Sequence, residues 1–304
     1  MARGLNSQLG RVEAGAGPSH SLRVSGEFAE RLANSAPSRL TETLGALVLN
    51  LHNLIENLRL TPAELRAAIE FLTEVGHSAD PRRQEWVLLA DAMGLTALLE
   101  DLNHPRPSGA TPNTVAGPFY RDDAPDLPDG ATISRDGKGE PLTVRGQISS
   151  LTGEPVAGAL VEVWQANAEG KYENQEPDHQ PEYNLRGKFR TDSLGRFSFR
   201  SVMPRGYALP ADGPVGRLMN RLGMCLERPA HLHFRVSAKG HETLVTHLFD
   251  KADPAIGRDA IFGVKPELLA DFRAVDPLAT GRRVDVNLVL CPRRQGQSTT
   301  EENT

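Results

Sequence analysis

The spacing of apolar residues divides the chain into two parts. From residue 40 to residue 58, leucine, isoleucine and valine recur at steps of three and four, which places them on one face of a helix. A second helix is predicted to open at Thr61-Pro62, where Glu64 completes a capping box. A third opens at Asp80-Pro81, and a short fourth covers residues 95–102. Residues 39–104 are therefore expected to form a helical domain.

After residue 104 the apolar pattern alternates with a period of 2, and proline and glycine punctuate the chain. Many short strands separated by turn signals indicate a mainly β fold, with a β-sandwich domain over residues 105–291. Two connections, residues 166–186 and 204–228, are longer than hairpins need, and binding sites are usually built on such loops. Seven runs are predicted to be strands, namely residues 142–148, 159–165, 187–191, 196–200, 231–236, 243–249 and 284–290.

The two ends of the chain and its composition narrow the functional classes. Residues 1–38 are rich in Gly, Ser, Ala and Arg and are expected to be disordered, and residues 292–304 are expected to form a polar tail. The net charge of −5 and the absence of a basic cluster argue against a nucleic-acid partner. Two cysteines, no signal-peptide pattern and no long apolar run predict a cytoplasmic protein that does not insert into a membrane.

The clearest chemical signal is a predicted strand that carries His231 and His233. Successive side chains of a strand point to opposite faces, so the two imidazoles share one face while Leu232 and Phe234 share the other. A His-x-His pair taken alone is more often hydrogen-bonded than metal-bound. Zinc lacks ligands here, because the sequence has no second pair of this kind, no Cys-x-x-Cys and no His-Glu-x-x-His.

Two tyrosines complete a possible donor set. The chain has only four tyrosines, and Tyr172 and Tyr207 fall in the two long connections. Each of them taken alone is more often a packing or hydrogen-bonding residue. Together with His231 and His233 they suit Fe(III), whose charge would keep both phenols ionised despite an unperturbed pKa near ~10. The residues therefore favour an Fe(III) site.

Three segments carry a resemblance to a known family. They are Gly170-Lys-Tyr172, Gly206-Tyr207-Ala-Leu-Pro and Arg228-Pro-Ala-His231-Leu-His233. In order and spacing these segments are similar to the Tyr/Tyr/His/His signature of intradiol aromatic-ring-cleaving dioxygenases, and the likeness extends through most of residues 40–290. A further segment, Ile261-Phe-Gly-Val-Lys265, resembles the Phe-Gly-Val-Lys segment of the hydroxyquinol 1,2-dioxygenases in particular. The resemblance implies an Fe(III) enzyme that cleaves hydroxyquinol, which is 1,2,4-trihydroxybenzene, with O2 to maleylacetate.

The resemblance also implies roles for single residues. Tyr172, Tyr207, His231 and His233 would hold the iron, and Tyr207 would leave it and take up a proton when the aromatic diol or triol binds. Arg228 would offset negative charge, although an arginine taken alone is more often part of a structural salt bridge. His247 stands where many catechol enzymes have glutamine, and we expect both residues to be catalytic. An apolar slot for the ring would be lined by Leu88, Asp91, Val115, Pro118, Phe119 and Ile261.

Asp91 and the apolar helix face also have ordinary alternatives. Asp91 matches a pocket acid of the hydroxyquinol 1,2-dioxygenases, and a carboxylate there could accept a hydrogen bond from the third ring hydroxyl, but Asp91 also fits a surface acid of a helix. In the related enzymes the helical domain forms the contact of a homodimer and a lipid-filled channel. The apolar face of residues 40–58 fits both features, and it equally fits a helix packed on its own neighbours.

Two other functions remain open at the level of the sequence. One lies within the family, a catechol or chlorocatechol 1,2-dioxygenase that gives cis,cis-muconates. The other belongs to a different class, because Gly153-Glu-Pro-Val-Ala-Gly also resembles the non-catalytic transthyretin-like sandwich modules. Such a module would have no reason to carry the two tyrosines and the two histidines together.

Overall fold

A computed structural model describes residues 20–80, 83–276 and 279–293 of the chain. The chain divides into two compact units, Met1–Thr73 and Glu74–Thr304. The boundary falls within the predicted helical domain of residues 39–104, so the last two helices of that domain belong to the same unit as the strands. Residues 1–19 of the expected N-terminal disorder and residues 294–304 of the expected tail lie outside the described residues.

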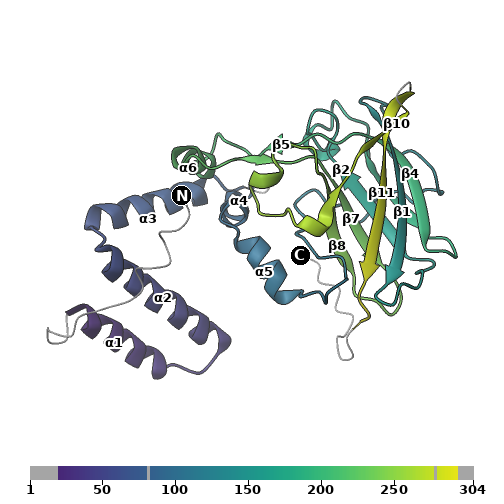
Figure 1. Ribbon diagram of the computed structural model, residues 1–304. Coiled ribbons are helices and arrows are strands. Elements are labelled where there is room, and N and C mark those ends of the chain that lie inside the picture. The colour runs from purple at the N-terminus through teal and green to yellow at the C-terminus, as the bar shows by residue number, and fades with distance from the viewer. Residues whose placement is uncertain (1–19, 81–82, 277–278, 294–304) are drawn as a thin grey trace. The chain divides into compact units, whose positions relative to one another are not determined.

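Helices make up the described part of the first unit. They are α1 (His20–Ala33), α2 (Arg39–Leu58) and the first part of α3 (Pro62–His77) (Figure 1). The side chain of Ser38 caps α2, and Thr61 and Glu64 form the predicted capping box at the start of α3. Helix α1 lies in a segment expected to be disordered. It is stabilised by packing, since the Phe28 ring meets His52 of α2 edge to face, at 5.9 Å between centroids.

In the described part of the second unit, three α-helices besides the end of α3 accompany the strands. They are α4 (Glu85–Ala92), α5 (Leu95–Asn103) and α6 (Pro214–Leu222). Helix α4 begins at Glu85 rather than at the expected Asp80-Pro81, and Pro81 lies outside the described residues. The buried Glu85 carboxylate accepts hydrogen bonds from Arg83 Nε at 2.8 Å and from the backbone N–H of Val215 at 3.0 Å, which ties α4 to α6.

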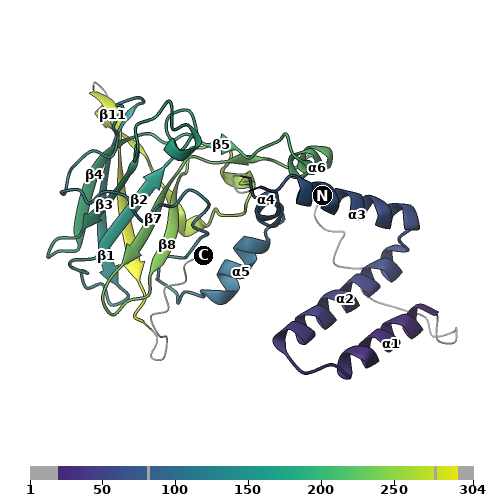
Figure 2. The same cartoon turned by 180° about the vertical axis from the view of Figure 1, so that it is seen from behind.

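Two sheets form a sandwich in the described part of the second unit (Figures 1 and 2). The four-stranded sheet has the order β10 (Arg273–Asp276), β11 (Ala279–Leu290), β1 (Pro141–Ser150) and β4 (Arg196–Val202). The five-stranded sheet has the order β3 (Arg186–Arg190), β2 (Leu160–Gln165), β7 (His231–Ser237), β8 (Leu244–Asp250) and β9 (Leu269–Ala270). A separate two-stranded ribbon joins β5 (Tyr207–Ala208) to β6 (Glu227–Arg228). All seven predicted strands are present.

The core lies between the two sheets. Val144 and Phe199 come from the four-stranded sheet, and Val163 and Phe234 come from the five-stranded sheet. Strand β7 alternates as its sequence predicts: Leu232, Phe234 and Val236 enter this core, and the two histidines point to the other face of the sheet. The outer face of the five-stranded sheet is therefore the place where a polar site is built.

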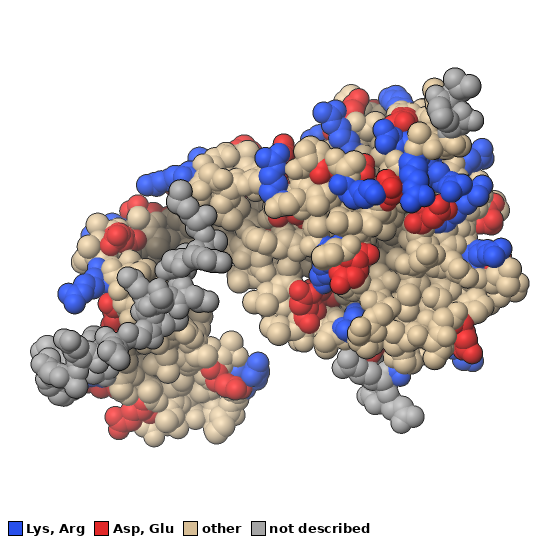
Figure 3. All heavy atoms as spheres, viewed as in Figure 1, with Lys and Arg blue, Asp and Glu red and all other residues tan. Residues whose placement is uncertain are grey.

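Basic and acidic side chains are mixed on the face of the molecule near β10 and β11. On the face drawn in Figure 3, Lys and Arg side chains near β10 and β11 are interleaved with Asp and Glu. Arg282 pairs with Glu140 and Arg283 with Asp285 in this region. None of the described helices combines the length and the apolar character that a membrane crossing needs.

Candidate metal centre

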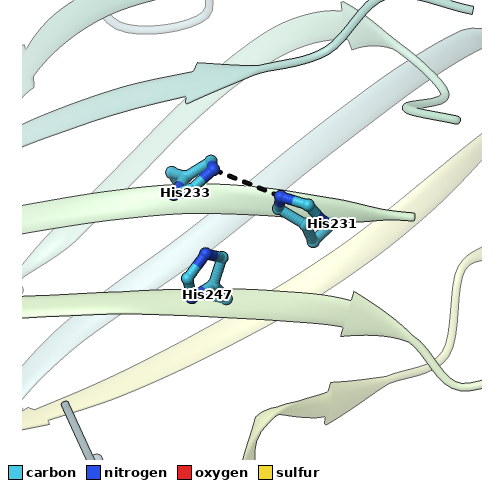
Figure 4. A group of neighbouring side chains, drawn as sticks. All are labelled: His231, His233 and His247. Carbon is cyan, nitrogen blue, oxygen red and sulfur yellow. Dashed lines mark hydrogen bonds between the residues drawn. The ribbon is translucent and has the colours of Figure 1, made fainter. Parts of the chain in front are cut away.

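Three histidines from two neighbouring strands form one cluster. His231 and His233 lie on β7, and His247 of β8 stands directly opposite His233 in the strand register. Side chains that face each other across a ladder share one face of the sheet, so the three imidazoles meet (Figure 4). Their ligand atoms lie within 4.8 Å of one another, and all three side chains are buried. Such a group is a possible metal site.

The nitrogens of the pair on β7 have the arrangement of metal ligands. His231 Nδ1 donates to the carbonyl of Pro229 at 2.7 Å, which leaves a lone pair on His231 Nε2. That atom lies 3.2 Å from His233 Nε2. Burial lowers the pKa of both imidazoles well below the ordinary value, and the positive charge of Arg228 lowers it further. Neutral histidines of this kind are ready to bind a cation.

Tyr172 lies against the two histidines of β7. Its hydroxyl oxygen is 2.9 Å from His233 Nε2 and 3.4 Å from His231 Nε2. Burial raises the pKa of the Tyr172 phenol well above its usual range, although the nearby Arg228 opposes the shift. A strong cation beside the oxygen is what would ionise such a phenol.

The loop of Tyr172 is held by a buried ion pair. Glu173, the next residue, accepts from Arg186 Nε of β3 at 2.7 Å, and Arg186 Nη1 donates to the carbonyl of Phe119. The Phe119 ring in turn stacks on Tyr172, with 4.3 Å between the centroids. The chain enters this loop at Gly170, whose φ is +81°. A Cβ there would lie 3.0 Å from the Gly206 carbonyl, so glycine lets the two tyrosine loops touch.

Tyr207 and Arg228 are brought together by the ribbon of β5 and β6, in which they are direct partners. Arg228 Nη1 lies 3.5 Å from the Tyr207 hydroxyl and 3.4 Å from His231 Nε2. The Tyr207 ring makes an edge contact with Tyr172, at 5.9 Å between centroids. The ribbon therefore brings the second tyrosine and a buried guanidinium to the histidine cluster.

His247 is held by Thr114, which was not among the predicted site residues. Its Nδ1 makes a short hydrogen bond with the hydroxyl of Thr114. Its Nε2 is buried and has no hydrogen-bond partner among the residues that the structure describes. Figure 4 shows a ring nitrogen of His247 directed toward the other two imidazoles. The free nitrogen thus belongs to the site.

Trp164 is a second residue that sequence reasoning missed. It faces His233 across the ladder between β2 and β7 and stacks on that imidazole, with 4.6 Å between centroids and 12° between the planes. The places of Trp164 and His247 beside His233 both follow from strand register, which a single sequence does not determine. The alternation within 159–165 was a usable signal, because it places Trp164 on the face opposite to the core residue Val163.

The predicted pocket residues divide into two groups. Phe119 stacks on Tyr172, and the backbone N–H of Ile261 lies 3.5 Å from Asp259, which is bonded to Arg228. Asp91 is partly buried: burial raises the pKa of its carboxyl, while a hydrogen bond from Thr96 and the charge of Arg228 lower it. These three residues therefore connect to the cluster.

The side chains of the other three make no hydrogen bond, ion pair or ring contact with the cluster. Leu88 is half-buried one helical turn before Asp91, Val115 is half-buried beside Thr114, and Pro118 is exposed. The backbone of their segment does pass the site, because a Cβ on Gly117 would lie 3.8 Å from His233 Cε1. Their place in a ring-binding slot stays a prediction.

The sequence of the chain is similar to those of known ring-cleaving dioxygenases. The Dioxygenase family matches residues 115–292, and the family described as Catechol dioxygenase N terminus matches residues 38–111. The chain is 48% identical over 246 residues to "Hydroxyquinol 1,2-dioxygenase" of Rhizobium sp. (strain MTP-10005), which covers 81% of this chain and 83% of that protein. It is 35% identical to "Catechol 1,2-dioxygenase" of Candida albicans, over 81% of this chain and 82% of that protein.

A solved structure agrees with this result. The crystal structure of hydroxyquinol 1,2-dioxygenase from Pseudomonas putida DLL-E4 superposes with a TM-score of 0.86 at 35% identity, over 90% of this chain and 99% of that chain. The helices, the sandwich and the buried Tyr and His cluster on its outer face fit a ring-cleaving dioxygenase. The chain belongs to the intradiol ring-cleavage dioxygenase family. The resemblance read from the three sequence segments is thereby confirmed.

Proposed function

We propose that the protein is a non-haem Fe(III) intradiol dioxygenase that cleaves hydroxyquinol with O2 to maleylacetate. The observation that carries this proposal is the convergence of the hydroxyl of Tyr172 on two buried imidazole nitrogens, with Tyr207 beside them. The proposal is also supported by the name of the relative that is 48% identical. Membership of this family leaves no role for the alternative of a transthyretin-like binding module.

The residues present fit a ferric ion. Tyr172, Tyr207, His231 and His233 would hold it, because two phenolates and two neutral imidazoles are suitable donors for a hard, highly charged cation. The raised pKa of the Tyr172 phenol supports this choice, since a doubly charged ion is less able to ionise a buried phenol. A ferric ion held by these four side chains would supply the Lewis-acid chemistry that makes an aromatic diol or triol reactive toward O2.

The side chains around the ligands would handle protons and charge. As substrate binds, Tyr207 Oη would accept the proton of one ring hydroxyl and become a neutral phenol. Arg228 Nη1, 3.5 Å from that oxygen, would donate to it and offset the negative charge of the bound aromatic. His247 would present its free Nε2 to the site while Thr114 holds the other side of the ring.

Asp91 would distinguish a triol from a diol. Its partly buried carboxylate lies close enough to Arg228 for their charges to interact, which supports a place at the edge of the ring site. A carboxylate there would accept a hydrogen bond from the third hydroxyl of hydroxyquinol. The alternative within the family is a catechol or chlorocatechol 1,2-dioxygenase, in which that interaction would have no partner.

The test is the visible spectrum of the purified protein together with an iron assay. We expect a red-brown band from tyrosinate coordinated to ferric iron, and a shift of this band when hydroxyquinol is added without O2. Tyr172→Phe should weaken or remove the band, whereas Tyr183→Phe should leave it, because Tyr183 bonds to the surface residue Asp123. A protein that stays colourless after reconstitution with Fe(III) contradicts the proposal.

We also propose that the protein is a cytoplasmic homodimer that holds lipid at the helical contact. Large apolar side chains of α2 stay exposed in the single chain, among them Leu47, Leu51 and Leu54. A second copy and an acyl chain would cover such a face. Light scattering and lipid extraction of the purified protein test this, and a monomer that carries no lipid contradicts it.

A further inference from the structure

Asp259 stands behind the guanidinium of Arg228. The two side chains form an ion pair with 3.2 Å between Asp259 Oδ1 and Arg228 Nε, and they are exposed by only 2% and 3%. The other carboxylate oxygen, Oδ2, accepts the backbone N–H of Gly263 at 2.9 Å. One buried carboxylate thus joins Arg228 to the loop of residues 259–263, which carries the predicted pocket residue Ile261.

The same loop is attached to β6 by its backbone. The N–H of Ala260 donates to the carbonyl of Glu227 at 3.0 Å, and the N–H of Phe262 closes a turn on the carbonyl of Asp259 at 3.2 Å. The residue that follows is glycine for a visible reason. A Cβ on Gly263 would lie 3.0 Å from Asp259 Oδ2 and 3.2 Å from Arg228 Nη2. The loop is therefore packed directly against the ion pair.

The ion pair uses Nε of Arg228 and leaves Nη1 and Nη2 available for other contacts. Because Nε is occupied by Asp259, the planar guanidinium has a fixed orientation, in which Nη1 lies near Tyr207 and His231. Nη2 is buried and has no hydrogen-bond partner among the described residues. A buried donor without a partner is unfavourable, so this atom is suited to an anionic oxygen of a bound molecule.

We propose that Asp259 is a positioning residue for the ring-cleavage reaction. It holds Arg228 in the orientation that serves Tyr207 and the bound aromatic, and it makes that orientation depend on the loop of Ile261. The inference rests on the proposed function for its catalytic consequence. The physical linkage of Arg228, Asp259 and Gly263 stands on the contacts alone.

A double-mutant cycle tests the linkage through turnover. Asp259→Asn keeps only one acceptor oxygen, so it cannot serve both Arg228 and Gly263. We expect kcat to fall by roughly 10- to 100-fold while the iron content and the visible band remain. Arg228→Gln should lower kcat at least as much, and adding Asp259→Asn to it should lower kcat no further. Losses that multiply in the double variant overturn the proposal.

Glu85→Gln is the matched control for loss of a buried carboxylate. Glu85 also accepts from one arginine Nε and from one backbone N–H, but it joins α4 to α6 and does not contact Arg228. We expect this variant to be less stable to urea and to keep its kcat. An equal loss of kcat in Glu85→Gln and Asp259→Asn would show that Asp259 acts only through stability, and it would overturn the positioning role.

Hydrogen exchange separates this inference from the proposed function. In Asp259→Asn the amide of Gly263 should exchange faster, and in Arg228→Gln the amides of the loop 259–263 should also be less protected. These amides need no iron and no turnover. If the wild-type protein binds iron poorly or leaves hydroxyquinol intact, the proposed function fails, and faster exchange in both variants still supports the linkage. Unchanged exchange in both variants overturns it.

Discussion

Replacing His233 by alanine is expected to abolish iron binding and ring cleavage together. His233 Nε2 is the atom at which the cluster converges, 2.9 Å from the Tyr172 hydroxyl and 3.2 Å from His231 Nε2. The change removes one of four proposed ligands and leaves a buried space beneath Trp164. Turnover should fall by about 10³-fold or more, because an incomplete site loses both the metal and its charge.

Three measurements on His233→Ala would separate loss of the metal from loss of the fold. Iron per chain and the visible band should both disappear, while circular dichroism should stay that of a sandwich. Added imidazole should restore part of the band by filling the space. The matched control is His241→Ala, because His241 follows the end of β7, and the one hydrogen bond of its ring within the described part of the chain goes to the carbonyl of Lys239. Full iron content in His233→Ala would remove His233 from the ligand set.

The part of the site that lies on one strand could be predicted from the sequence. Alternation over residues 231–236 places both histidines opposite the core residues Leu232 and Phe234, and the structure has this arrangement. The pairing of His233 with His247 and with Trp164 depends on the register of three strands. Register is set by turns and long-range packing, which a single sequence does not reveal.

The long connections were harder to predict, because their order comes from contacts distant in the sequence. Residues 204–228 were expected to be a loop, and the structure has the ribbon of β5 and β6 and helix α6 there. The helix did carry signals: Pro214 opens it, Gly223 ends it with φ +65°, and Val215 and Met219 share its buried face. The two-residue strands carried none, so the family resemblance assigned roles to Tyr207 and Arg228 but did not predict that they pair.

The role of Asp259 in the electrostatics of the site could not be predicted from the sequence either. It is one of 39 acidic residues in the chain, and it is separated from Arg228 by 31 positions. No local pattern distinguishes it from a surface acid. Only the fold shows that its carboxylate is buried and shared between a guanidinium and a backbone N–H. Charged residues that position others are therefore found from contacts, and ligands that alternate on a strand are found from sequence.

Asp91→Ala is expected to change the substrate preference rather than the chemistry. Hydroxyquinol turnover should fall by roughly 10- to 100-fold in kcat/KM, the usual effect of losing a hydrogen bond to a charged group. Catechol lacks the third hydroxyl, so its turnover should stay close to that of the wild type. The ratio of the two kcat/KM values is the measurement. Equal losses on both substrates would remove the reason for choosing hydroxyquinol over catechol as the substrate.

The pKa of Asp91 adds a dependence on pH with a defined sign. Burial raises this pKa, so the carboxyl takes up a proton at higher pH than an ordinary aspartate does. As pH falls through the raised value, the acceptor is lost, and the wild-type preference for hydroxyquinol should decline toward the preference of the variant. Because its pKa is raised in the folded state, the Asp91 carboxyl makes a contribution to stability that is fully present below its unfolded-state pKa. That contribution is lost as pH rises through its folded-state pKa. Asp91→Ala should therefore not unfold the protein at neutral pH, which leaves the changed preference as the effect of the missing carboxylate.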